Sequence, residues 1–156
     1  MPETLNLTSL HCIFYIYHTF AFRSDNKLTL EEKKTIAGFM YRWVGKDQEK
    51  TTKIINETIY WSKAHIKTPA DQIGAMISMV EFLKKQTDFS VDRREYLLMD
   101  IRNIARSDGQ FLDQQKKWHD MLANILELEI RISKASHDDI DGAVKKVERR
   151  KIGFRR

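Results

Sequence analysis

The sequence is poor in the residues that cross-link chains and interrupt helices. It has one cysteine, Cys12, among 156 residues, which excludes an internal disulfide framework and is typical of a reducing cytoplasm. Two prolines and six glycines favour long helices over many short strands. A chain of this length is expected to form one domain with a single substantial core.

The sequence also lacks a long hydrophobic run. Its most apolar segment, residues 10–22, contains His11 and His18 and is too short to span a bilayer. The first four residues, MPET, lack the basic start of a signal peptide. We therefore expect a cytoplasmic protein, in which any membrane contact is peripheral and on the inner face.

An excess of charge is confined to one end of the chain. Residues 145–156, KKVERRKIGFRR, contain seven lysines and arginines and one glutamate, a net charge of +6. Since the whole chain has a net charge of +5, residues 1–144 carry a net charge of −1. The sequence indicates a near-neutral domain with a basic tail, and only the tail is expected to attract anionic partners.

Apolar residues recur at intervals of three and four, the spacing of one helix face, and strand-type alternation is absent over any useful length. The pattern predicts an all-α fold: a single-domain bundle of six main helices in residues 1–136. A short basic C-terminal helix or tail is expected in residues 137–156. In the first helix, the predicted apolar stripe consists of Leu10, Ile13, Phe14, Tyr17 and Ala21.

Local signals predict several helix ends. Gly45 follows the second apolar stripe and is a natural C-terminal stop. Asp47 and Ser90 are suited to cap the third and fifth helices. Thr68-Pro69 predicts the start of the fourth helix, because proline is favoured at the first helical position, where no backbone N–H is needed.

One turn sequence occurs twice. Residues 23–34 read RSDNKLTLEEKK and residues 106–117 read RSDGQFLDQQKK. Asp108 therefore follows Asp25 by 83 positions (108 − 25). Each stretch lies where one predicted helix ends and another begins. The repetition predicts two similar helical hairpins, each with an acidic turn, at related positions in one bundle.

Each repeated turn also contains a predicted cap for the helix that follows it. Thr29 and Glu32 have the spacing of a T-x-x-E capping box, in which both side chains bond orphan amides at the helix start. In the second turn, Asp113 is the expected cap.

The residues around the two turns resemble the TerB-like domain family, which is named after a tellurite-resistance protein. The matching segments read AFRSDNKLTLEE at residues 21–32 and IARSDGQFLDQQ at residues 104–115, and the resemblance extends over roughly residues 8–130. It implies an all-α fold that brings the two acidic turns close together. It also implies divalent-metal binding by those acids and a role in stress-response assemblies near the membrane, rather than a known catalytic reaction.

Carried over to this chain, the resemblance implies a metal site made by Asp25, Glu32 and Asp108. Gln115 stands where the family prefers glutamate, and its neutral amide oxygen is a poorer ligand for a hard cation than a carboxylate. The three acids are therefore expected to hold calcium or magnesium weakly, with waters completing the shell. The alternative is that they only cap helices and stabilise turns, each contributing about 0.5–2 kcal/mol.

The sequence contains no recognisable catalytic signature. Cys12 has no histidine in a catalytic arrangement and is expected to be a small buried hydrophobe. His11 and His18 are seven positions apart, which is too far for a single ion to be held by both. A glycine-rich phosphate loop and a G-x-S-x-G motif are also absent. We therefore expect a protein that is not an enzyme.

The basic tail offers a second possible function. A basic cluster near a membrane surface gains about 1 kcal/mol per base from anionic head groups. It can also neutralise nucleic-acid phosphates, although we expect this partner less, and it can be no more than a solvated helix end. The cluster surrounds Phe154 and consists of Lys145, Lys146, Arg149, Arg150, Lys151, Arg155 and Arg156.

Two functions are therefore expected from the sequence. The first is a non-enzymatic, TerB-like binding or regulatory module in a stress-response context of the tellurite-resistance type, which has a protein partner and binds a divalent cation weakly at its paired acidic turns. The alternative is an adaptor that docks on an anionic membrane or on nucleic acid through its basic C-terminal tail.

Overall fold

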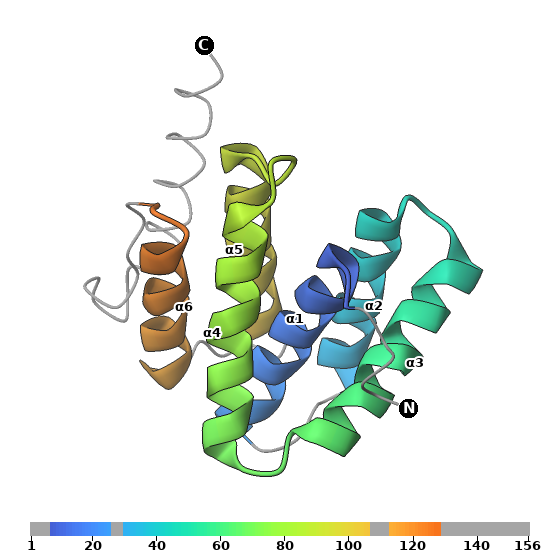
Figure 1. The fold of residues 1–156 in the computed structure, drawn as a ribbon, viewed down its shortest axis with the longest axis horizontal. Coiled ribbons are helices and arrows are strands. Elements are labelled where there is room, and N and C mark those ends of the chain that lie inside the picture. The colour runs from blue at the N-terminus through green and yellow to red at the C-terminus, as the bar shows by residue number, and fades with distance from the viewer. Residues whose placement is uncertain (1–6, 26–29, 107–112, 129–156) are drawn as a thin grey trace.

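The computed structural model describes residues 7–25, 30–106 and 113–128 (Figure 1). Within these residues the chain forms six helices and no strand, which confirms the predicted all-α bundle. The predicted tail, residues 137–156, lies outside the described residues, as does the boundary placed after residue 136. The helices are α1 (Ser9–Asp25), α2 (Leu30–Val44), α3 (Gln48–His65), α4 (Pro69–Lys85), α5 (Val91–Arg106) and α6 (Asp113–Ile125).

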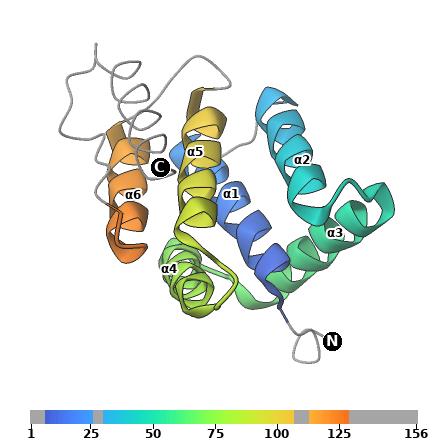
Figure 2. The same ribbon diagram turned by 90° about the horizontal axis from the view of Figure 1, so that it is seen from above.

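Helix α1 is the centre of the bundle and contacts each of the other five helices. Figures 1 and 2 show α2 and α3 on one side of it and α4, α5 and α6 on the other. Every side chain from residue 11 to residue 17 is buried, so the single apolar stripe expected for this helix was too narrow. A helix that is apolar around most of its circumference has to be enclosed by other helices.

Three of the predicted helix starts are confirmed. Asp47 Oδ1 accepts a 3.0 Å hydrogen bond from the N–H of Lys50 at the start of α3. Thr68 forms a capping box with Asp71 at the start of α4, with Pro69 in the first helical position. At α5, the Oγ of Ser90 accepts a 3.3 Å bond from the N–H of Arg93.

Two further predicted caps flank the repeated turns. The expected cap Asp113 lies inside the first turn of α6 instead of before it. Helix α2 begins at Leu30, directly after the predicted cap Thr29, which lies outside the described residues.

Helices α2 and α6 end in the same way. Gly45 follows α2 with φ = 96°, and the N–H of Lys46 bonds the carbonyl of Tyr41 at 2.8 Å. After α6, Glu127 has φ = 63°, and the N–H of Leu128 bonds the carbonyl of Ala123 at 2.9 Å. Both are Schellman endings, in which a left-handed residue lets the chain satisfy the last carbonyls of the helix. The predicted stop at Gly45 is confirmed. The helix ending at Glu127 was not predicted, and it occurs without a glycine.

The two hairpins α1–α2 and α5–α6 bury equivalent positions. On α2 the side chains of Glu32, Ile36 and Met40 are buried. Residues 83 positions further along, Gln115, His119 and Ala123 on α6, are buried too. Helix α5 contacts α1 and α2 as well as α6, so the hairpins pack directly against each other. The duplicated turn thus belongs to two hairpins that present the same face to the core.

Candidate functional site

The structure describes one of the three predicted metal ligands in full. Glu32 lies in the first turn of α2 and its residue is 1% exposed. Asp25 is the last residue of α1, but the placement of its side chain is not described. Asp108 lies outside the described residues. Gln115, the residue that departs from the family pattern, is buried at 3% exposure on α6.

Within residues 7–25, 30–106 and 113–128, no group of three or more His, Cys, Asp or Glu side chains is placed to hold a metal ion. The described residues therefore do not form the predicted metal site by themselves. A test of this site has to change the acids of the two turns. All seven bases of the predicted anion-binding tail, from Lys145 to Arg156, likewise lie outside the described part of the chain.

The helices that lead into the two turns end on the same side of the bundle. In Figure 1, α1 and α5 both run from the upper to the lower side of the molecule. The contacts between them also bring the two helices side by side. Residues 25 and 106, at which α1 and α5 end, thus lie on a common face of the fold.

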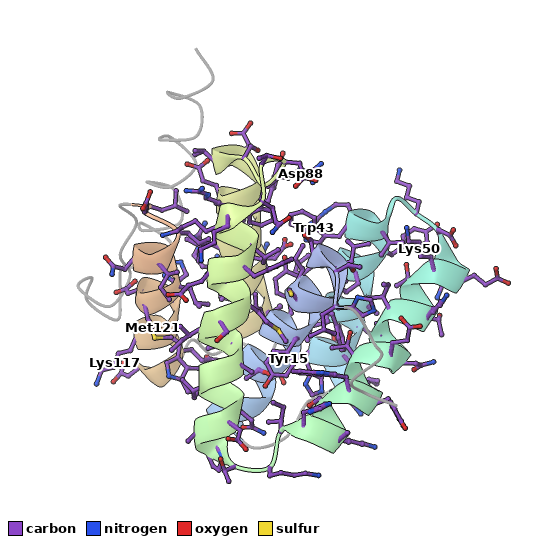
Figure 3. The ribbon with its side chains drawn as sticks, viewed as in Figure 1. Tyr15, Trp43, Lys50, Asp88, Lys117 and Met121 are labelled. Carbon is purple, nitrogen blue, oxygen red and sulfur yellow. The ribbon has the colours of Figure 1, made fainter. Side chains whose placement is uncertain are left out.

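A polar cluster built around the buried side chains of Tyr17 and Asp100 joins α1, α2 and α5. The hydroxyl of Tyr17 on α1 donates to Asp100 Oδ2 on α5 at 2.5 Å. Arg42 Nη2 on α2 donates to both carboxylate oxygens of Asp100, at 2.9 and 2.8 Å. Trp43 Nε1, which Figure 3 shows near the upper ends of α2 and α5, donates to Asp100 Oδ2 at 3.0 Å and to the Tyr17 hydroxyl at 2.9 Å.

The electrostatics of this cluster suit a structural role. Complete burial, followed by the neighbouring charge of Asp100, raises the pKa of Tyr17 well above its usual value of 10.0, so the phenol keeps its proton. The carboxylate of Asp100 is 3% exposed and accepts from three side chains, as a buried charge must to offset the loss of water. The cluster holds the two hairpins in register.

A second buried polar group joins α5 to α6. Arg102 Nη1 donates to His119 Nε2 at 2.9 Å, and His119 Nδ1 then donates to Asp120 Oδ1 at 3.1 Å. Arg102 and His119 are 1% and 0% exposed. The sequence does not predict this pair, because Arg102 and His119 are polar residues that would be expected on the solvent-exposed faces of their helices. No local pattern joins two residues across a hairpin.

His11 is satisfied by bonds that begin at the start of α1. The N–H of Thr8 donates to His11 Nδ1 at 3.0 Å, so the ring proton lies on Nε2. That nitrogen donates to Glu57 Oε1 of α3 at 2.9 Å. The arrangement resembles a capping box in which histidine replaces glutamate, and it ties the first helix to the third.

Cys12 is buried at 3% exposure, as predicted. Burial raises the pKa of its thiol from 9.0 to about 11, which leaves almost no thiolate at neutral pH. Since the thiolate is the reactive form, this cysteine is a packed apolar side chain with low reactivity.

Two apolar grooves open between the helices. One, of about 420 Å³, lies between α1, α3 and α4 and is lined by Cys12, Trp61, Met79 and Phe82, among others. The second, of about 260 Å³, lies between α1, α2 and α3. Its described lining consists of Phe14, His18, Lys33, Ile36, Ala37, Ile55 and Ile59.

No protein-family model, no curated protein and no solved structure matches this chain. Among the described helices, none is long and apolar enough to cross a membrane.

Proposed function

We propose that the chain is a non-enzymatic binding and regulatory module of the TerB-like type, in which the acids of its two turns bind a divalent cation weakly. Bound cation would tie the two hairpins together and stabilise one arrangement of the bundle. The ligands proposed are Asp25, Glu32 and Asp108, with calcium or magnesium as the cation and waters completing its shell.

One observation carries this proposal. Tyr17 and Asp100, which are hydrogen bonded, are 83 positions apart, and so are Asp25 and Asp108. Equivalent residues of α1 and α5 thus touch, and both helices end on the same side of the bundle (Figure 1). The neighbouring ends of α1 and α5 support the proposal that the acids of the two turns share one ion.

The nature of the side chains supports a binding module over an enzyme. The only cysteine is buried and has a raised pKa, which does not suit a nucleophile. Asp100 and His119 are engaged in contacts between helices. Such contacts stabilise the fold, and a conformational response to a cation would act through them.

The test is thermal unfolding of the metal-stripped protein, with and without millimolar calcium, magnesium or manganese. A cation at about ten times its dissociation constant stabilises by about 1.4 kcal/mol, which should raise Tm by about 3–5 °C in a chain of this size. The double variant Asp25→Asn with Asp108→Asn should lose this response.

The matched control is the double variant Glu49→Gln with Glu81→Gln, which removes the same charge from exposed positions on α3 and α4. It should keep the full cation response. If wild type and both double variants respond equally, or if none responds, the turns are only helix connections and the proposal is wrong.

A further inference from the structure

The groove between α1, α2 and α3 combines an apolar floor with positive charge. Its floor is formed by Phe14, Ile36, Ala37, Ile55 and Ile59. Lys33 and His18 are the other lining residues that the structure describes. Nearly all of the exposed lining is therefore hydrocarbon, and the only charged side chain among the described lining residues is a cation.

The charge lies at one end of this groove. His18 is one helical turn closer to the end of α1 than Phe14. Lys33 is one turn closer to the start of α2 than Ala37. Since α1 and α2 form a hairpin, both positions lie toward the end at which the two helices are connected, and the apolar residues extend away from it.

His18 is held where it can respond to a bound anion. Its ring packs on Phe14, with the ring centroids 5.5 Å apart and an angle of 43° between the planes. Burial, followed by the positive charge of Lys33, lowers the pKa of His18 from 6.5. Lys33 places a positive charge at this end of the groove, so an anion beside His18 and Lys33 would be attracted to it.

We propose that this groove binds a small amphipathic carboxylate, a medium-chain fatty acid, with the carboxylate beside Lys33 and His18 and the alkyl chain along Phe14, Ile55 and Ile59. A volume of about 260 Å³ suits a ligand of modest size. Among the described lining residues, the one lysine matches the single charge of a carboxylate. This site is separate from the metal site proposed above and does not depend on it.

The larger groove between α1, α3 and α4 does not support an equally specific inference. Its described lining, which includes Trp61, Ile66 and Phe82, is apolar apart from Ser78. It offers no charge with which to select or orient a ligand, and nothing on its surface distinguishes one apolar occupant from another.

The first test is a binding series with hexanoate, octanoate and decanoate, kept below their micelle-forming concentrations and followed by calorimetry. Each methylene buried in the groove should tighten the dissociation constant about fourfold. The methyl NMR signals of Ile55 and Ile59 should shift on binding, and the pKa of His18 should rise, because the carboxylate offsets the field of Lys33.

The second test separates the charge from the apolar contact. Lys33→Gln should weaken octanoate binding about fivefold and leave the binding of neutral octanol unchanged. The matched control is Lys34→Gln, which removes a neighbouring exposed lysine that does not line the groove. It should leave octanoate binding as in the wild type.

Three results would overturn the proposal. The first is that octanoate does not bind at millimolar concentration. The second is that Lys33→Gln and Lys34→Gln affect octanoate binding equally. The third is that octanoate shifts the signals of Trp61 and Phe82, which line the other groove, and not those of Ile55 and Ile59.

Discussion

Tyr17 and Asp100 form a 2.5 Å hydrogen bond between α1 and α5. The two residues are 83 positions apart, so they occupy equivalent positions in the two hairpins. A residue can touch its repeat equivalent only near the axis that relates the two copies. The Tyr17–Asp100 contact therefore marks the line along which the hairpins meet. Arg42 and Trp43 of α2 also donate hydrogen bonds to Asp100 at this contact.

We expect Asp100→Ala to lower the free energy of unfolding by about 3 kcal/mol, because it removes the acceptor shared by Tyr17, Arg42 and Trp43. Tyr17→Phe should cost about 1 kcal/mol, since Trp43 keeps its bond to Asp100. Urea denaturation measures both changes. Exposed Tyr60→Phe is the control and should change stability by less than about 0.5 kcal/mol. An Asp100→Ala loss no larger than the control would contradict the structural role of the cluster.

Glu127 ends α6 with φ = 63°, a conformation in which only glycine avoids a steric penalty. We expect Glu127→Gly to stabilise the protein by about 1 kcal/mol in urea denaturation. The substitution also removes the 3.5 Å ion pair with Lys84, but an exposed pair of this kind contributes little.

Glu127→Ala controls for the ion pair, because it loses the carboxylate and keeps the strained backbone; its stability should match the wild type. Gly45→Ala is the reverse test. A Cβ at Gly45 meets nothing within 4 Å, so a loss of about 1–2 kcal/mol would come from its φ of +96° alone. If Glu127→Gly and Glu127→Ala are equally stable, the left-handed backbone is not the cause.

His18 should make the protein less stable in mild acid. Burial and then the charge of Lys33 lower the folded-state pKa of His18 from 6.5, so below that pH the unfolded chain binds the proton more readily. Its contribution is fully present above about pH 6.5, the unfolded value, and is lost as the pH falls from there through the lower folded-state pKa. Between about pH 8 and pH 5, the free energy of unfolding should change less with pH for His18→Gln than for the wild type. Parallel curves would show that His18 titrates alike in both states.

Cys12 should report on opening of the core. With a pKa of about 11, about one thiol in a thousand is ionised at pH 8, and burial also blocks access to it. Labelling with iodoacetamide should therefore be more than about 100 times slower in the native protein than in urea-unfolded protein. Native labelling at the unfolded rate would mean that α1 is exposed.

The basic tail provides the test of the alternative function. Removal of residues 145–156 takes away seven bases. If the protein is a membrane adaptor, the full chain should bind vesicles rich in anionic lipid at low salt, and the shortened chain should not. The cation response of the turns should be unaffected by the truncation. Equal vesicle binding by both chains would remove the tail as the docking element.

Much of the helical framework is predictable because its signals are local. Asp47, Thr68 and Ser90 each bond an amide three positions away, and a sequence shows such neighbours directly. The repeated turn predicts two hairpins for the same reason. Gly45 is predictable too, because glycine is the usual residue in a left-handed helix ending.

The polar contacts and the groove are not predictable, because they depend on partners far away in the chain. Asp100 reads as a solvent-facing residue until Tyr17, 83 positions earlier, is brought against it. His18 appears as a lone histidine on an apolar face, and only the packing of α2 places Lys33 near it. Glu127 gives no glycine signal for a left-handed helix ending, and the burial of Leu128 beside it is visible only in the fold.

The enclosure of α1 has a consequence for the order in which the protein is completed. This helix leaves the ribosome before the other five described helices, yet its side chains pack against α5 and α6, which are made later. A nascent chain that ends before α5 holds an apolar helix with part of its surface unprotected, and such surface favours aggregation. Helix α1 is thus synthesised before the helices that bury it, and productive folding has to wait for the second hairpin.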